Sequence, residues 1–240
     1  MYPTSYSHGW QVCRNCHAPN MLVTRHDNWH LRANPGYWGD SKPEVLILGF
    51  SKGANQLQAS ESGTFDRVAF AKARVRLGKI LDVMGVSLHG QTLDQALTAS
   101  GKGIGVASLI RCGISLDKHD KLITSGPVMV KAMSDKWSRD VMERCVRSHL
   151  LSHMPSSVQR ILLLGNADEY VLRVKKLMAS VFVDYRDLNK MSFTAIGRTW
   201  IFSAHPAGGN GHFNEWAEGD ASTGQGYKRW LAQSAFGMAA

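Results

Sequence analysis

The sequence predicts an α/β fold, a three-layer α/β/α sandwich with a mainly parallel central sheet. An order of strand, glycine-containing loop and helix occurs three times, starting from strand-like segments at 44–49, 103–111 and 159–165. Continuous apolar runs such as 44–49 are typical of parallel strands buried on both faces. Repeated strand–loop–helix units are typical of a parallel sheet covered by helices. We expect a single domain over residues 1–240, with a loop-rich, cysteine-containing N-terminal segment at 1–43.

The composition limits the classes of function. The chain is 44% hydrophobic, enough for a buried core, yet no stretch approaches the ~20 apolar residues of a membrane helix. Residues 1–30 show no signal-peptide pattern, so we expect a cytoplasmic protein without a membrane partner. The net charge of +9 runs through the body of the chain and favours a polyanionic partner, with nucleic acid ahead of an anionic membrane. Nothing implies an obligate protein partner.

Four cysteines form a candidate metal centre. Cys13 and Cys16 make a C-x2-C pair on one tight turn, which is the usual half-site for zinc or an iron–sulfur cluster. Cys112 and Cys145 are distant in sequence, so the fold must bring them in. In a cytosolic protein such a set is more typical of metal ligands than of disulfides. The spacing alone does not choose the metal, and four separate buried thiols are the structural alternative.

Hydrophobic periodicity predicts further elements. Residues 66–85 form the clearest helix; its apolar face consists of Leu77, Ile80, Leu81 and Met84, and its basic face of Lys72, Arg76 and Lys79. That basic face is either a solvated surface or a stripe that tracks phosphates. A helix after residue 165 has Asn166 as its N-cap. Strands at 192–196 and 198–204 follow, and a closing helix at 226–236 packs Trp230 and Leu231 inward.

The last strand ends at His205-Pro206 and is followed by two glycines and a cluster of polar residues. Polar groups just beyond the carboxyl end of a strand are where open α/β sheets bind ligands. His205-Pro206, small residues and Asn210 resemble the second motif of the uracil-DNA glycosylase superfamily, His-Pro-Ser-Gly-x-Asn. Gly49 and Gly53 match its first motif, although Lys52 replaces a proline there.

The cysteines resemble those of the iron–sulfur (family 4-like) branch of that superfamily. An N-terminal C-x2-C is followed by a cysteine that closes a strand, here in Leu109-Ile-Arg-Cys112, and by one on the next helix, here Cys145. The resemblance implies a [4Fe-4S] cluster, with zinc as the alternative. Two positions depart from the family. Ser51 stands where many relatives carry the Asp or Asn that positions water, and Ser108 where an Asn reads uracil.

The resemblance implies a monofunctional DNA glycosylase that hydrolyses the N-glycosidic bond of a flipped-out base. His205 would donate to the departing base, Asn210 and Ser51 would contact base or water, and Asp66 or Glu61 would supply a carboxylate. Phe65, with Phe70 as second choice, would stack on the base. The other implied base contacts are Gly49, Phe50 and Ser108; the implied DNA contacts are Lys52, Gly53, Gly208, Gly209, His212 and Phe213; the implied cluster ligands are Cys13, Cys16, Cys112 and Cys145.

Ser51 and Ser108 do not determine which base is the substrate. They leave room for a modified base of phage DNA such as glucosylated hydroxymethylcytosine, as in anti-phage members of the superfamily, and uracil or another deaminated base ranks equally. A catalytically silent DNA-binding protein of the same fold is one alternative function. A zinc-stabilised RNA- or nucleotide-binding protein is another.

Overall fold

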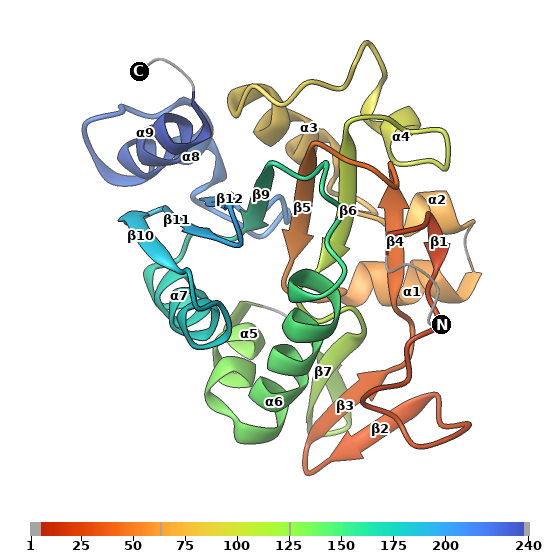
Figure 1. Cartoon of the computed structure of the whole chain (residues 1–240). Helices are drawn as coiled ribbons and strands as arrows, with labels where there is room; N and C mark the ends of the chain where they lie inside the picture. The colour runs from red at the N-terminus through yellow and green to blue at the C-terminus, as the bar shows by residue number, and fades with distance from the viewer. Residues whose placement is uncertain (1–5, 63, 125, 238–240) are drawn as a thin grey trace.

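The computed structural model describes residues 6–62, 64–124 and 126–237. Its strands form an eight-stranded sheet in the order β1-β4-β6-β5-β9-β12-β11-β10 and a four-stranded sheet in the order β2-β3-β7-β8 (Figure 1). The fold is thus mixed α/β, as expected for its class.

Four parallel strands form the centre of the large sheet: β6 (Ile104–Ser108), β5 (Val45–Gly49), β9 (Arg160–Leu164) and β12 (Arg198–Ser203). Most of their residues are buried, because their apolar side chains pack on both faces. The edges are antiparallel, with β4 (Gly36–Gly39) and β1 (Gly9–Trp10) on one side and β11 (Ser192–Ala195) and β10 (Arg186–Asn189) on the other. The sheet is therefore parallel at its centre and mixed overall.

The N-terminal segment is more regular than the expected loop. Besides β1 and β4 it contributes β2 (Val23–His26) and β3 (Trp29–Arg32), which pair with β7 (Gly113–Lys118) and β8 (Lys121–Ile123) in the small sheet. These strands were not expected, although loops still connect them, because their aromatic residues are core residues: Trp29, Tyr37 and Trp38 are all buried. Tertiary packing of these rings, rather than local propensity, orders the segment.

The larger helices pack in two groups. One contains α3 (Arg74–Val83), α8 (Phe213–Glu218) and α9 (Gly224–Phe236), and the other α5 (Gly126–Ser134), α6 (Lys136–Cys145) and α7 (Asp168–Val181). In Figure 1, β10 to β12 lie between α8 and α9 above and α7 below. A π-helical turn, Val146–Leu151, continues α6, and the short helix α4 (Leu93–Ala96) precedes β6. No helix in the described ranges is long and apolar enough to cross a membrane.

The helix expected at 66–85 is two helices. α2 (Phe65–Val68) is capped by Ala69, and α3 begins at Arg74. The loop between them holds Phe70 and Lys72 at positive φ, 52° and 64°. Arg74 stabilises the break, since its guanidinium donates to the carbonyl oxygens of Asp66 and Ala69. The basic face was therefore misassigned at Lys72, whereas Leu77, Ile80, Leu81 and Met84 are buried as predicted.

Two smaller predictions near the carboxyl end were also wrong. Asn166 is not the N-cap of α7; its amide donates to Oε1 of Gln225 at 2.6 Å, and Ala167 precedes the helix. Trp230 remains 36% exposed on α9, whereas Leu231 is buried as expected.

Candidate active site

Three parallel strands end at one cavity of about 590 Å³. Gly49 ends β5, Ser108 ends β6, and His205 follows β12, so the carboxyl ends of neighbouring strands bring together residues far apart in sequence. α1 (Ala54–Ser62) begins at the same cavity. The predicted site residues that line it are Gly49, Phe50, Ser51, Gly53, Ser108, His205, Gly208, Gly209 and Asn210.

His205 has a defined tautomer in this cavity. The backbone N–H of Ala207 donates to His205 Nδ1 at 3.1 Å. In the neutral ring the proton therefore resides on Nε2, which is the donor. Burial lowers the pKa of His205, so the ring is neutral at pH 7. The residue can thus donate a hydrogen bond without carrying a positive charge.

Arg76 holds the loop that follows His205. Its Nη1 donates to the carbonyl oxygen of Ala207 at 2.7 Å, to that of Gly208 at 3.2 Å and to that of Asn210 at 3.4 Å. The guanidinium also lies over the ring of Phe213, 4.8 Å from its centroid. Its role as a brace was missed in the sequence, because a basic residue on a helix face gives no signal for a contact 131 residues away.

Asn210 is occupied by the same loop. Its Nδ2 donates to the carbonyl oxygen of His205 at 2.9 Å, and its Oδ1 accepts from the backbone N–H of His212 at 3.2 Å. In this arrangement the amide shapes the loop rather than facing a base. Ser51 and Ser108 differ, because neither hydroxyl has a hydrogen-bond partner within the described part of the chain, and both are only half-buried at the cavity.

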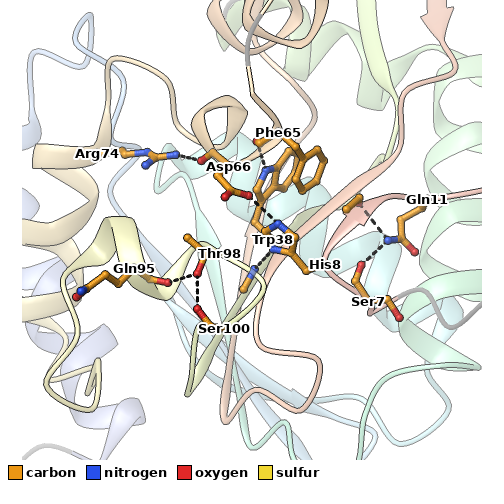
Figure 2. Close-up of polar contacts among 12 residues, drawn as sticks. Ser7, His8, Gln11, Trp38, Phe65, Asp66, Arg74, Gln95, Thr98 and Ser100 are labelled. Atoms are coloured by element: carbon orange, nitrogen blue, oxygen red, sulfur yellow. Dashed lines mark hydrogen bonds and ion pairs between the residues drawn. The ribbon is translucent and has the colours of Figure 1, made fainter.

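Neither expected carboxylate lies in the cavity. Asp66 Oδ1 contacts His8 Nε2 at 2.8 Å (Figure 2). The Trp38 indole N–H donates to the neighbouring Phe65 backbone carbonyl at 2.8 Å. Glu61 pairs with Arg32 and lines a different cavity. Among the described residues that line the candidate active site, none is Asp or Glu. The assignment of Asp66 or Glu61 as a base at this site was therefore wrong, because both side chains are directed elsewhere.

Phe65 is also displaced from the expected position. Its ring stacks on Trp38, with centroids 4.6 Å apart and planes 5° apart, and it does not line the cavity. Trp38 itself lines the cavity, together with Phe50 and Phe70. The second choice, Phe70, thus lies at the site, held there by its left-handed backbone. Trp38 was missed because β4 could not be recognised from the sequence.

Lys52 does not reach the surface. Its side chain is 1% exposed, and its Nζ donates to the carbonyl oxygen of Arg111 at 2.6 Å, directly before Cys112. Burial lowers the pKa of Lys52 to about 8. It cannot contact a DNA phosphate from this position, so that assignment was wrong. Lys72 is instead the exposed cation among the described residues that line the cavity.

The two implied DNA contacts beyond the glycines, His212 and Phe213, differ in exposure. Phe213 is buried beneath Arg76 and cannot enter a DNA stack, which corrects its assignment. His212 is exposed next to Glu215, with 3.4 Å between His212 Nδ1 and Glu215 Oε2. The role of His212 therefore stays a prediction.

The four cysteines converge on a separate enclosed space. Cys13, Cys16, Cys112 and Cys145 all line one cavity of about 10 Å³, together with Arg111 and Arg144. That volume corresponds to about one water molecule. Cys13 and Cys16 come from the loop before β2, Cys112 from the segment before β7, and Cys145 from the end of α6. The fold thus joins the distant pair to the C-x2-C turn.

The electrostatics of the thiols differ. A hydrogen bond with Cys145 lowers the pKa of Cys16 to about 7, and the charge of Arg144 acts in the same direction. Burial raises the pKa of Cys112 to about 11. The pKa of Cys145 is also raised, because it shares the hydrogen bond with Cys16 and is buried.

Within the described ranges, no three or more His, Cys, Asp or Glu side chains are grouped closely enough to hold a metal ion. The donor chemistry nevertheless fits a metal centre, since four sulfur atoms face one space and two arginines can balance thiolate charge.

Comparison with protein-family models and with curated protein sequences finds no match for this chain.

Proposed function

We propose that the protein is a monofunctional DNA glycosylase of the uracil-DNA glycosylase type, with a three-layer α/β/α arrangement around its sheet. The single observation that carries this proposal is the neutral, Nε2-protonated His205 at the carboxyl ends of β5, β6 and β12. The two helix groups on the sheet and the basic charge of the chain support it.

The proposed reaction hydrolyses the bond between a base and C1′ of its deoxyribose. In the transition state the sugar becomes an oxocarbenium ion and the base becomes an anion, so charge on the base must be stabilised. His205 Nε2–H donates to that anion and keeps its own proton. Water adds its oxygen to C1′ and loses a proton to solvent, and the departed base anion takes up a proton from solvent, so the products are an abasic sugar and the free base.

Cleft residues other than carboxylates would position the water. The hydroxyls of Ser51 and Ser108 face the cavity without protein partners in the described part of the chain, and each can accept or donate one hydrogen bond. A dissociative reaction requires only a weak nucleophile, because the cation forms before water attacks. The absence of Asp and Glu among the described lining residues is compatible with this order of events.

DNA would be held at the rim of the cleft. Lys72 supplies a charge there, and Gly208 and Gly209 are exposed with backbone N–H groups that donate to no described residue. Arg76 occupies the carbonyl oxygens of Ala207 and Gly208, which leaves the N–H side of this turn to phosphate oxygens.

The size of the cavity supports a base larger than uracil as one of two substrate classes. A volume of about 590 Å³ lies within the ~300–1,000 Å³ of sites for drug-sized molecules, and serine at 51 and 108 leaves space for substituents. A glucosylated hydroxymethylcytosine of phage DNA and a deaminated base such as uracil are therefore both proposed. We place the enzyme in the cytoplasm.

The four cysteines would hold a [4Fe-4S] cluster, or zinc, in a structural role. Such a group would join the N-terminal loop, the segment before β7 and α6. No step of the reaction passes through it.

The test is the formation of alkali-sensitive abasic sites in DNAs that contain uracil, hypoxanthine, hydroxymethylcytosine or its glucosylated form, single- and double-stranded. Cleavage that is lost in His205→Ala would establish the activity and name the base. DNA binding without abasic sites on any substrate would overturn it.

That second result would favour a silent DNA-binding protein of the same fold. The observation favouring this candidate is the combination of Ser51 and a cleft whose described residues include no carboxylate. It predicts equal affinity for modified and unmodified DNA and no effect of His205→Ala.

A further inference from the structure

A second large cavity, of about 540 Å³, lies at the other end of α1. It is lined by residues that include Trp10, Arg14, Leu22 and Arg32. Nothing in the proposed chemistry uses it. Its lining includes an indole ring, aliphatic side chains, two guanidinium groups and the carboxylate of Glu61.

Apolar side chains at this cavity are unusually accessible. Trp10 is 46% exposed and Leu22 is 67% exposed, and their neighbours Val12 and Met21 are 66% and 46% exposed. Large apolar side chains gathered on a surface mark a binding site more often than isolated ones do. The segment therefore presents a surface that a ligand would cover.

The charge of the segment identifies a polyanion as that ligand. Residues 1–26 contain no Asp or Glu. Arg14 is exposed and has no side-chain partner in the described ranges, whereas Arg32 pairs with Glu61. An uncompensated guanidinium next to an exposed indole is the combination that binds nucleic acid by phosphate pairing and base stacking.

A continuous set of rings connects this cavity to the candidate active site. Trp10 lies edge-on to Phe65, with centroids 4.8 Å apart, and Phe65 stacks on Trp38, which lines the active-site cavity. α1 runs between the two cavities: Asn55 lines the first and Ser60 the second. Five residues of helix rise about 7.5 Å. A stacked strand advances about 3.4 Å per nucleotide, so Asn55 and Ser60 are separated along the helix axis by about the length of two nucleotides.

We propose that the second cavity is a subsite for a flanking nucleotide of the DNA strand that carries the target base. Trp10 stacks on the base of that nucleotide, and Arg14 pairs with its phosphate. This inference rests on the proposed glycosylase function, because the register is counted from the flipped base. It extends that function by giving the enzyme a preference for DNA that continues beyond the target on one side.

The experiment measures binding of the full chain to fluorescent single-stranded oligonucleotides with a tetrahydrofuran abasic mimic at the target position. One oligonucleotide has about six nucleotides on each side of the mimic, and two others are cut to about one nucleotide on either side. Trp10→Ala should weaken binding of the long form at least about fivefold. Arg14→Ala should lower the slope of log affinity against log salt by about 1.

The truncated oligonucleotides decide the register. Truncation on one side should remove the effects of both variants, whereas truncation on the other side should preserve them. Effects that are absent on the long form, or equal on both truncated forms, overturn the subsite.

Two controls separate this inference from loss of folding and from the proposed function. Arg14→Glu at an exposed position is compared with Arg186→Glu on β10, at the opposite edge of the large sheet, which should not change affinity. Unmodified DNA of the same length is measured in parallel. If the protein shows no preference for the abasic mimic but the variants still weaken DNA binding, the cavity is a nucleic-acid site without a register to a target base, which overturns the flanking subsite and leaves the glycosylase proposal without support from binding.

Discussion

The backbone N–H of Ala207 donates to Nδ1 of His205 at 3.1 Å. A second proton on this ring would have to reside on Nδ1, where it would face another donor. Burial disfavours the same protonation and lowers the pKa of His205 below the usual value of about 6.5. The contact therefore selects the state in which the residue can donate to a leaving base from Nε2.

This relationship predicts the pH dependence of catalysis. The neutral ring is the active form, so the single-turnover rate should be constant above pH ~6.5 and should fall at pH values below the lowered pKa of His205. A decrease that begins above pH 7 would contradict this role. In His205→Ala the rate should drop by ~10²–10³, as for loss of one charge-stabilising donor, and the acid inflection should disappear.

The same group predicts a contribution to stability. A histidine with a lowered folded-state pKa binds fewer protons in the folded state than in the unfolded chain at pH values between the two pKa values. Its contribution to the free energy of unfolding is therefore complete above the unfolded pKa and decreases as the pH falls below it. Between pH 7.5 and pH 5.5, the free energy of unfolding measured in urea should decrease less in His205→Ala than in the parent chain.

Arg76→Ala should impair the active-site loop without removing any group that contacts the base. Loss of three carbonyl partners and of the contact with Phe213 should destabilise the fold by about 1–3 kcal/mol and lower the rate constant more than DNA affinity. Arg76→Lys should restore part of the rate. Lys79→Ala, on the same helix and in an exposed ion pair with Glu218, is the matched control and should have little effect. Equal effects of Arg76→Ala and Lys79→Ala would contradict the bracing role.

The two lysines of the cleft loops should behave differently in DNA binding. Lys72→Met should reduce the salt slope of DNA affinity by about 1, because an exposed cation is lost from the rim. Lys52→Met should leave the slope unchanged, because Lys52 Nζ is buried against Arg111. Fluorescence anisotropy measures the DNA affinity of both variants at salt concentrations from about 50 to 200 mM, an interval over which the loss of phosphate contacts changes the affinity strongly. A change of slope in Lys52→Met alone would refute the placement.

Each of the four cysteines should be required for a metal centre. Serine substitution at Cys13, Cys16, Cys112 or Cys145 should abolish the brown absorbance of the anaerobically purified protein and lower its iron content. Zinc in place of iron, at one ion per chain, would identify the alternative centre. Metal-free protein that keeps its thermal midpoint in all four variants would show that the cysteines are ordinary buried thiols.

Local sequence patterns predicted the central strands and the residues that end them. Apolar runs identified β5 and β9, and the break at His205-Pro206 identified the end of β12, because burial on both faces and the missing N–H of proline are properties of the segments themselves. Since parallel strands end at the same edge of a sheet, the grouping of Gly49, Ser108 and His205 also followed.

Only the tertiary structure decided which side chains point into the cleft. Asp66, Phe65 and Lys52 were expected at the site from the sequence. Instead, Asp66 contacts His8, Phe65 stacks on Trp38, and Lys52 donates to the backbone carbonyl of Arg111. Trp38, Lys72 and Arg76 reach the site or its loop instead, because packing of β4 and the break after Ala69 direct them there. From the sequence alone came the central strands β5 and β9, the end of β12, the edge at which these strands end and the set of four cysteines. The partner of each side chain depends on contacts between segments up to 150 residues apart, which local periodicity does not encode.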